Sequence, residues 1–376
     1  MILMRIALDI TPVTAQRTGV GEYVYQLLRH CARQRKEYVW MGWSSGRNRP
    51  IRLGLRRSIH LPVPTRLLHG VWRTLGILSP EALLGGADVA HGTNYVLPPL
   101  RHTRGILNIY DLAFMIRPEW SSPKIRRHFS RTVMEDAARA DAVITCSEYS
   151  KKDIARLCRI PEHKIHVIYG AADPLFTPAE TDEERMAFAR RYGITTPYAL
   201  YVGTLESRKN IFTLLEAFSR VARHGNASLV LAGRIGWGME QLAETLNRLG
   251  IADRVIITGY LPDRETVRDA CRGAACFVMP SWYEGFGLPL LEAMACGCAC
   301  VAANTSSLPE VGGDAVRYVE PDDPEALGGV MREWLEDRDS RSYWGHRALE
   351  ASRRFSWEDS AERLLELYER VAACGR

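Results

Sequence analysis

Two glutamates, Glu284 and Glu292, stand at the ends of a glycine-rich segment, a spacing that can support chemistry. The segment 284–292 reads EGFGLPLLE and follows the short apolar run 276–280. A short apolar run of this kind predicts a buried strand. Pro289 is typical of the first turn of a helix. The sequence therefore predicts a strand, a loop and a helix in this order, with one acid in the loop and the other in the helix.

The predicted loop suits an anionic ligand that also carries hydroxyl groups. Its backbone N–H groups and the positive end of the helix dipole favour an anion such as a diphosphate. A carboxylate on each side of that anion can accept hydrogen bonds from sugar hydroxyls. The pattern is what a nucleotide-sugar site needs. The alternative interpretation is an exposed acidic loop followed by an ordinary solvated helix glutamate.

The wording of this segment resembles a known family motif. The phrase EGFGLP at 284–289, with Glu292 completing E-x7-E, is similar to the motif of retaining glycosyltransferases with the GT-B fold, in the large group called family 4. The resemblance spans nearly the whole chain and is strongest in residues 199–312. It implies an α/β fold of two Rossmann-like doubly wound domains that face each other across a cleft, with the C-terminal helix crossing back to the first domain.

The resemblance also implies roles for the residues of the segment. Glu292 is expected to hold the ribose hydroxyls of the nucleotide, and Glu284 to bind hydroxyls of the donor sugar and stabilise its cationic transition state. The leaving diphosphate is expected to lie against the backbone between the two acids, at Gly285, Phe286, Gly287 and Leu288.

A second loop carries two adjacent cations. Residues 203–210 read GTLESRKN and follow a short apolar run. Arg208 and Lys209, opposite a helix N-terminus, would stabilise the departing diphosphate without a metal ion. In the resembling family a lysine at the position of Lys209 grips the diphosphate, and an arginine usually follows the glycine where this chain has Thr204. The alternative interpretation is a pair of exposed loop cations.

The first half of the chain offers weaker candidates. Gly19 and Gly21 open a predicted helix after the first strand, and the resemblance places a donor- and acceptor-facing loop there. Tyr110 replaces the histidine that touches the transferring sugar in the family, and Asp111 beside it can orient the loop or bind an acceptor hydroxyl. His91, at another predicted strand end, is expected to be structural.

Two further loops of the second half follow predicted strands. From their position alone, we expect them to lie beside the nucleotide base. They are represented by Gly233 in one loop and by Tyr260 and Leu261 in the other.

Charge is distributed unevenly along the 376 residues. Residues 1–180 hold 26 Lys and Arg against 15 Asp and Glu, a balance of +11, and the remainder holds 23 against 29, or −6. The excess lies at two places, which are Arg47, Arg49, Arg52, Arg56, Arg57, Arg66 and Arg73, and then Lys124, Arg126, Arg127 and Arg131. A basic first half of the chain indicates contact with an anionic membrane surface or with a phosphate-bearing acceptor. The alternative is a solvated basic face with no partner. Nucleic acid is not expected, because no recognised binding module accompanies the charge.

Composition favours a cytoplasmic protein. If the protein contacts a membrane, we expect the contact at the inner face of that membrane. No apolar stretch has the length of a membrane span, and the first residues enter a strand without a signal-peptide pattern. Nine cysteines without a C-x-x-C pair indicate reduced thiols. Cys296, Cys298 and Cys300 are expected to form a helix end and a buried strand, so no metal site is predicted.

Alternating strand and helix patterns predict two α/β domains. The expected boundaries are 1–170 with a returning helix 356–376 for the first, acceptor-binding domain, and 171–355 for the nucleotide-sugar-binding domain. Residues 44–80 are expected to be irregular. Strands are expected at 5–9, 39–43, 106–110, 142–146, 165–168, 199–202, 229–232, 255–258, 276–279, 300–303 and 316–319, and helices at 22–33, 124–139, 147–158 and 357–373.

The expected activity is transfer of a hexose from a nucleoside-diphosphate sugar to a glycan or a lipid-diphosphate-linked acceptor, with no cofactor. GDP-mannose is the first expectation for the donor, because the GTLE phrase resembles a branch of mannosyltransferases of surface polysaccharides, and UDP-sugars are the second. A GT-B epimerase or phosphorylase is one alternative. A non-catalytic GT-B scaffold or nucleotide-binding subunit is the other, because Thr204 and Tyr110 depart from the family pattern.

Overall fold

The computed structural model describes residues 3–121 and 123–374, except for the side chains of 124, 125, 127, 128 and 131. The basic positions Lys124, Arg127 and Arg131 therefore have side chains outside the described part. The chain forms two compact units. The first comprises Met1–Met115, Lys124–Gly170 and Ser356–Arg376, and the second comprises Ile116–Pro123 and Ala171–Phe355. The short segment Ile116–Pro123 thus groups with the second unit, whereas the sequence boundaries assigned it to the first.

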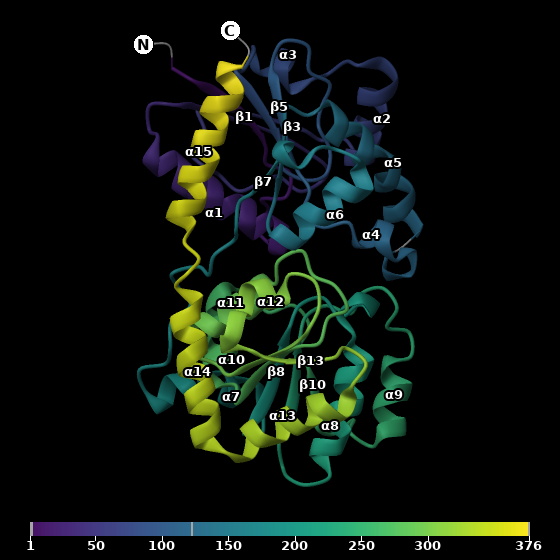
Figure 1. Ribbon diagram of the computed structural model, residues 1–376, viewed down its shortest axis with the longest axis vertical. Helices are drawn as coiled ribbons and strands as arrows, with labels where there is room; N and C mark the ends of the chain where they lie inside the picture. Colours follow the sequence, from purple (N-terminus) through teal and green to yellow (C-terminus); the bar gives the residue numbers. More distant parts are fainter. Residues whose placement is uncertain (1–2, 122, 375–376) are drawn as a thin grey trace. The chain divides into compact units, whose positions relative to one another are not determined.

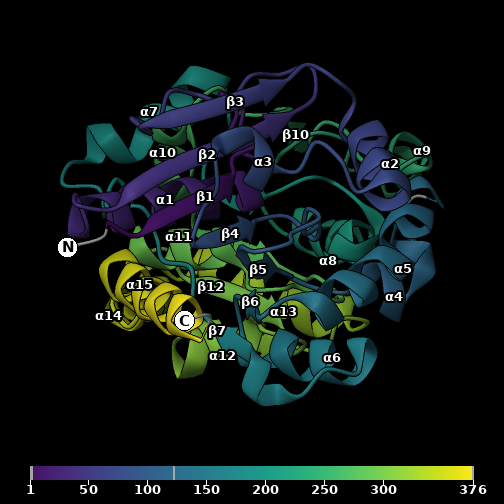
Figure 2. The same ribbon diagram turned by 90° about the horizontal axis from the view of Figure 1, so that it is seen from above.

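The first unit is built on a seven-stranded parallel sheet, in the order β3-β2-β1-β4-β5-β6-β7 (Figures 1 and 2). Its central strands are apolar runs with almost no exposure, as expected for a sheet covered on both faces. The strands are β1 (Arg5–Asp9), β2 (Val39–Ser45), β3 (Arg57–Leu61), β4 (Val89–Gly92), β5 (Arg104–Asn108), β6 (Ala142–Thr145) and β7 (Ile165–Val167).

Helices flank this sheet, and the last helix of the chain belongs to the same unit. The hydroxyl of Ser147 caps α6 by accepting a hydrogen bond from the Ser150 amide, a role that serine commonly takes at a helix N-terminus. The apolar face of α15 is buried, including Tyr368, and α15 packs on α1 (Figure 1). The helices are α1 (Gly19–Gln34), α2 (Thr65–Leu75), α3 (Pro80–Leu84), α4 (Ala113–Ile116), α5 (Pro123–Arg139), α6 (Glu148–Cys158) and α15 (Trp357–Ala373).

The prediction of irregular structure over 44–80 is wrong, because β3 and α2 lie there. β3 is an edge strand that pairs only with β2 and is half-exposed, so its sequence lacks the apolar run of a central strand. In α2 only Leu68, His69 and Trp72 are buried, although its apolar residues recur at helical spacing. β3 therefore offers no apolar run to recognise, whereas the helical spacing in α2 is overlooked because it lies in a stretch rich in Arg, Gly and Pro.

The second unit contains a six-stranded parallel sheet, in the order β10-β9-β8-β11-β12-β13. Its strands are β8 (Tyr198–Val202), β9 (Ser228–Ala232), β10 (Val255–Ile257), β11 (Cys276–Met279), β12 (Cys300–Ala303) and β13 (Arg317–Val319). Its α-helices are α7 (Asp182–Tyr192), α8 (Ile211–Ala222), α9 (Leu242–Leu249), α10 (Arg264–Gly273), α11 (Leu288–Ala295), α12 (Leu308–Gly312), α13 (Pro324–Glu336) and α14 (Arg338–Ser352). Cys296, Cys298 and Cys300 are buried free thiols between α11 and β12, as predicted.

Strand order identifies where a ligand can enter the second unit. β8 lies between β9 and β11, so the connections that leave its two neighbours run in opposite directions along the sheet. In doubly wound sheets this switch point opens a crevice at the carboxyl ends of the strands. The two loops that carry the candidate charges follow β8 and β11 and therefore meet at this point. In the first unit the equivalent position lies between β1 and β4.

Candidate active site

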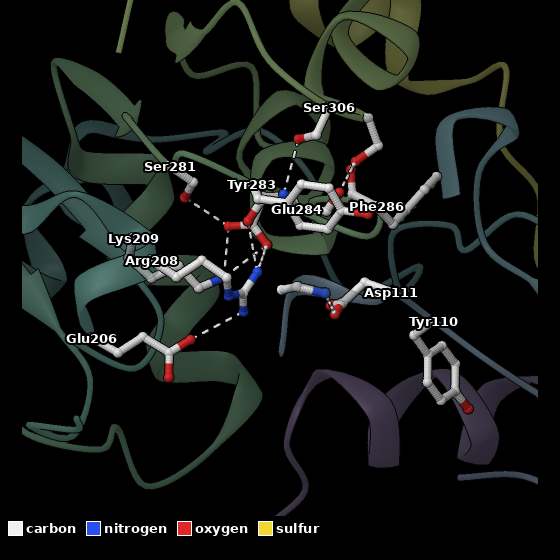
Figure 3. A network of polar contacts seen from close by, with 12 residues as sticks. Tyr110, Asp111, Glu206, Arg208, Lys209, Ser281, Tyr283, Glu284, Phe286 and Ser306 are labelled. Carbon is white, nitrogen blue, oxygen red and sulfur yellow. Dashed lines mark hydrogen bonds and ion pairs between the residues drawn. The ribbon is translucent and has the colours of Figure 1, made fainter. Parts of the chain in front are cut away.

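Glu284 lies at the centre of a charged cluster formed by the loops after β8 and β11 (Figure 3). The ammonium group of Lys209 lies 2.6 Å from its Oε1 and 2.7 Å from its Oε2. Nη1 of Arg208 lies 3.3 Å from Oε2, and the hydroxyl of Ser281 donates to Oε1 at 2.7 Å. The structure thus brings together three residues that the sequence selected from two loops some 75 positions apart.

The two cations of the cluster are directed inward. The side chain of Arg208 is 15% exposed and that of Lys209 13% exposed, so the alternative of two exposed loop cations is wrong. Arg208 also donates to the carbonyl of Tyr283 at 2.7 Å and pairs with Glu206 at 3.0 Å. Because Arg208 points to Glu284, it supplies positive charge that Thr204 does not provide.

Glu284 is ionised in this environment. Burial alone raises the pKa of its carboxyl group, but the charges of Lys209 and Arg208, and hydrogen bonds from Lys209 and Ser281, outweigh burial. The net result is a pKa below the ordinary value for glutamate. A buried carboxylate held ionised can accept hydrogen bonds from ligand hydroxyls and stabilise a developing positive charge.

Asn210, which the sequence analysis did not single out, holds three loops of the site together. Its backbone adopts a left-handed conformation, with φ of +56°. Its amide Nδ2 donates to the carbonyls of Pro280 at 3.1 Å and Pro321 at 2.6 Å, which lie just after β11 and β13. Asparagine tolerates this conformation better than most residues, which is the only local signal that could have identified it.

The loop between Glu284 and α11 is fixed by two serines and one glycine. The hydroxyl of Ser307 lies 3.0 Å from the carbonyl oxygens of both Glu284 and Phe286, either of which can accept its hydrogen bond, and Ser306 accepts from the Glu284 amide at 2.9 Å. Gly287 has a φ of +100° as the N-cap of α11, and a Cβ there would lie 2.9 Å from Leu308. Only glycine fits this turn, after which Leu288 and Pro289 begin the helix, as predicted.

Glu292 is buried on α11, where its carboxylate pairs with Arg264 on α10. The guanidinium of Arg264 lies 4.6 Å from the centre of the Phe176 ring. Sequence reasoning missed Arg264, although it follows the loop of Tyr260 and Leu261 directly. The ribose contact of Glu292 stays a prediction, and any such ligand would share the carboxylate with Arg264.

The remaining loop residues of the second unit differ in their exposure. Gly203 and Gly233 lie back to back after β8 and β9, where a Cβ on Gly233 would come within 1.8 Å of the Gly203 carbonyl oxygen. Tyr260 is 40% exposed, with the guanidinium of Arg234 5.2 Å from its ring centre. Leu261 is buried, so its side chain packs mainly in the interior of the unit and not along an open ligand site.

In the first unit, the two glycines at the start of α1 have different surroundings. A Cβ on Gly21 would lie 2.4 Å from the carbonyl oxygen of Pro12, so the absence of a side chain here serves packing within the loop. Gly19 has open space around it and could admit a ligand. Next to them, Glu22 is buried and paired with Arg17 at 2.7 Å.

Tyr110 belongs to a buried hydrogen-bond network. The Tyr368 hydroxyl lies 2.7 Å from Nδ1 of His91, and Nε2 of His91 lies 2.7 Å from Oδ1 of Asn108. Asn108 in turn donates to the Tyr110 hydroxyl at 3.0 Å, which donates to the carbonyl of Thr93 at 2.7 Å. The hydroxyl of Tyr110 is therefore engaged inside the unit, contrary to its expected orientation toward a sugar.

Asp111 and His91 have structural contacts in the described state. Oδ1 of Asp111 accepts from the Ala113 amide at 3.1 Å at the start of α4, and its own amide donates to the Tyr95 hydroxyl. Burial lowers the pKa of His91 to about 4, although the hydrogen bond with Asn108 acts in the opposite direction, so His91 is neutral. The structural role expected for His91 agrees with these contacts, and the acceptor contact of Asp111 stays a prediction.

Neither a metal-binding cluster nor a membrane-spanning helix occurs among the described residues. No group of three or more His, Cys, Asp or Glu side chains there is arranged to hold a metal ion. Likewise, no helix among residues 3–121 and 123–374 is both long and apolar enough to cross a membrane.

Comparison with known proteins identifies matches over both halves of the chain. Residues 182–351 match the profile described as "Glycosyl transferases group 1", and residues 17–174 match the one described as "Glycosyltransferase Family 4". The chain is 29% identical over 388 residues to O-antigen chain mannosyltransferase B of Escherichia coli, covering 97% of this chain and 100% of the relative. It is 28% identical over 394 residues to D-inositol 3-phosphate glycosyltransferase of Xylanimonas cellulosilytica, covering 95% and 93%.

A solved structure supports the fold. The Anabaena protein Alr3699/HepE in complex with UDP-glucose superimposes with a TM-score of 0.76 at 16% identity, covering 98% of this chain and 100% of that one. The structure thus has two parallel sheets, with a charged cluster at the switch point of the second. The sequence matches glycosyltransferase families over both halves of the chain. The chain belongs to the group 1, family 4 glycosyltransferases of the GT-B fold.

Proposed function

We propose that the protein transfers a hexose from a nucleoside-diphosphate sugar to a hydroxyl acceptor with retention of configuration. The observation that carries the proposal is the buried Glu284 carboxylate, held ionised by Lys209 and Arg208 beside the N-terminus of α11. Glu284 binds hydroxyls of the donor sugar and stabilises the positive charge that develops on its ring. Charge stabilisation of this kind is commonly the largest contribution to catalysis.

The leaving diphosphate is received by the opposite charges of the same cluster. Lys209, Arg208 and the backbone of Gly285 to Gly287 stabilise it as the bond between the anomeric carbon and the phosphate oxygen breaks. On the same face, the acceptor oxygen forms the new bond to the anomeric carbon, and its proton passes to the departing phosphate oxygen. Because Lys209 and Arg208 already place two positive charges at this position, we expect turnover without an added divalent metal.

We propose mannose from GDP-mannose as the donor sugar, and a surface glycan or a lipid-linked glycan as the acceptor. The mannosyltransferase name of the E. coli relative supports this choice. UDP-sugars are the second candidate, since a structure of similar fold holds UDP-glucose. The basic first half of the chain favours an acceptor that bears a phosphate group. The name of the Xylanimonas relative, D-inositol 3-phosphate glycosyltransferase, also contains a phosphate-bearing compound.

A nucleotide-binding subunit without turnover is the second candidate function. It is favoured by the inward hydroxyl of Tyr110 and by the pairing of Glu292 with Arg264. Both observations concern groups that the resemblance assigns to the donor. The two functions predict the same nucleotide binding and differ in the consumption of the nucleotide sugar.

Thermal unfolding with UDP, GDP and ADP, with and without Mg²⁺, followed by product analysis with the matching sugar nucleotide, tests both candidates. A nucleotide present at about one hundred times its Kd adds about 2.7 kcal/mol to the free energy of unfolding. We expect GDP to raise the melting temperature most, without Mg²⁺, and GDP-mannose to be consumed slowly even without acceptor. Stabilisation without consumption, with any acceptor extract, would favour the subunit, and no stabilisation by any nucleotide would refute the site.

A further inference from the structure

The first unit exposes an apolar stripe along α2 and the turn that follows it. Leu67 is 59% exposed, Leu75 64%, Ile77 50% and Leu78 45%. These are four of the ten large hydrophobic side chains exposed on the described residues, within twelve positions of the chain, so they are not scattered singly. With the half-exposed Val71, which lies one turn from both Leu67 and Leu75, we call them the α2 stripe.

The α2 stripe is not the face by which α2 joins the fold. The buried face, about 100° around the helix from the stripe, carries Leu68 and Trp72, which are 1% and 7% exposed and lie in one core cluster with Trp43. Those buried side chains attach the helix to the core of the first unit. The exposed leucines therefore require a different explanation.

The turn after α2 holds its side chains outward at a conformational cost. Gly76 ends the helix in the left-handed conformation, and Leu78 has a φ of +59°, which side-chain-bearing residues rarely adopt. The indole Nε1 of Trp72 donates to the carbonyl of Leu78 at 3.0 Å and fixes this geometry. Strain of this kind persists where the surroundings enforce it and is concentrated at functional surfaces.

The segment that contains the α2 stripe is rich in arginine. Residues 38–80 contain seven arginines and no aspartate or glutamate. Arg66 on α2 makes no ion pair with any described residue, and Arg73 reaches Glu135 at 3.4 Å, with both side chains exposed. The Gly46 amide donates to the carbonyl of Val63 at 2.9 Å, which places the start of the arginine-bearing loop beside the start of α2.

We propose that the α2 stripe and its arginines form a docking surface for an anionic lipid bilayer. Helix α2 would lie in the plane of the interface, with the leucines and Ile77 among the upper acyl chains and the arginines at the headgroup phosphates. Charge complementarity favours this occupant over a second copy of the chain, because two such basic faces repel each other. The surface acts by adsorption, which requires no spanning helix.

Vesicle flotation tests the surface with the full chain. We expect the protein to float with vesicles containing phosphatidylglycerol and to remain unbound with vesicles of phosphatidylcholine alone, and the binding to weaken as salt is raised. The double variant Leu67→Gln, Leu75→Gln should lower the vesicle partition coefficient about tenfold. Arg66→Gln with Arg73→Gln should lower it at low salt and have little effect at high salt.

Matched control variants distinguish binding by the α2 stripe from non-specific adsorption to vesicles. Tyr149→Gln removes a large exposed side chain from α6, outside the α2 stripe. Arg33→Gln removes a cation from the last turn of α1. Both should float like the unmodified protein. If the double variant melts at a lower temperature, Ile77→Gln, which lies outside the helix, replaces it.

Other outcomes would overturn the proposal. These are no flotation of the unmodified protein, equal flotation of the leucine variant and its controls, or a concentration-dependent dimer that the leucine variant abolishes, which would identify a second copy as the occupant. The variants should retain nucleotide-induced stabilisation, because their positions lie outside the proposed donor site. The membrane proposal can therefore fail while the transferase proposal stands, and the reverse is also true.

Discussion

The two units share one plan but place different chemistry at the carboxyl ends of their sheets. After β8 and β11, the second unit gathers an ionised Glu284 with two cations. In the first unit, near the carboxyl ends of β4 and β5, His91, Asn108 and Tyr110 form a network of uncharged hydrogen bonds. Equivalent folds therefore do not produce equivalent sites. The parallel sheet determines where side chains meet, and the residues there decide between charge stabilisation and structural support.

Replacing the central carboxylate should have the largest effect. Glu284→Gln should lower kcat about a thousandfold, because the charge that stabilises the transition state is lost while the shape is kept. Nucleotide affinity should be unchanged or tighter, since Lys209 and Arg208 no longer pair with a carboxylate. Steady-state kinetics and calorimetric titration with GDP measure the two quantities, and unmodified turnover would show that Glu284 is not catalytic.

Removing a cation should cost stability as well as activity. Lys209→Met leaves the buried Glu284 carboxylate with the more distant Arg208 as its remaining cation, which should lower the free energy of unfolding by about 4 kcal/mol. Urea denaturation at neutral pH measures this loss. The double variant Lys209→Met, Glu284→Gln should recover much of the lost stability, and a failure to do so would mean that the ion pair is not its source.

The neutral network of the first unit should appear in the pH dependence of stability. The pKa of His91 is near 4 when folded and about 6.5 when unfolded, so between these values the unfolded chain binds more protons. Stability should therefore fall by up to about 3 kcal/mol as the pH is lowered through this window. Burial raises the pKa of Asp9 to about 6, although hydrogen bonds from Thr11 act in the opposite direction, and Asp9 gives a slope of opposite sign.

The difference between the unmodified protein and His91→Gln cancels the contribution of Asp9. Urea denaturation from pH 4 to pH 7 should show a smaller loss of stability toward low pH in the variant. Parallel curves for the two proteins would contradict a buried neutral His91.

A pair of glycine substitutions should show the smallest effects and the clearest contrast between the units. Gly233→Ala should lower the free energy of unfolding by about 2 kcal/mol, because a Cβ meets the Gly203 carbonyl. Gly19→Ala should change it by less than about 1 kcal/mol, since nothing lies within 4 Å of the added carbon. Equal effects in thermal unfolding would show that close backbone approach does not distinguish the two loops.

The sequence predicts local features of this molecule better than contacts between distant loops. The buried strands, the start of α11 at Leu288 and the span of α15 follow from apolar runs, proline and periodicity, and the structure confirms them. Glu284 and Lys209 could be chosen because each lies in a distinctive short phrase. That they touch is a consequence of strand order in the second sheet.

Other features could not be predicted because they depend on tertiary contacts. Nothing local to Arg264 indicates its pairing with Glu292, and nothing beside Tyr110 indicates that its hydroxyl turns to Thr93. Leu261 is buried although its loop is polar and rich in turn residues. Each of these positions is decided by a partner far away in the sequence.

The amide of Asn210 sets a rule for engineering this protein. Because one side chain binds the carbonyls of Pro280 and Pro321, the loops after β8, β11 and β13 form one mechanical unit. A chimera that exchanges only the segment 284–292 with that of a relative would keep a foreign loop on a native anchor. Exchanges intended to alter donor preference should therefore transfer the three loops together, with Asn210 retained as their common support.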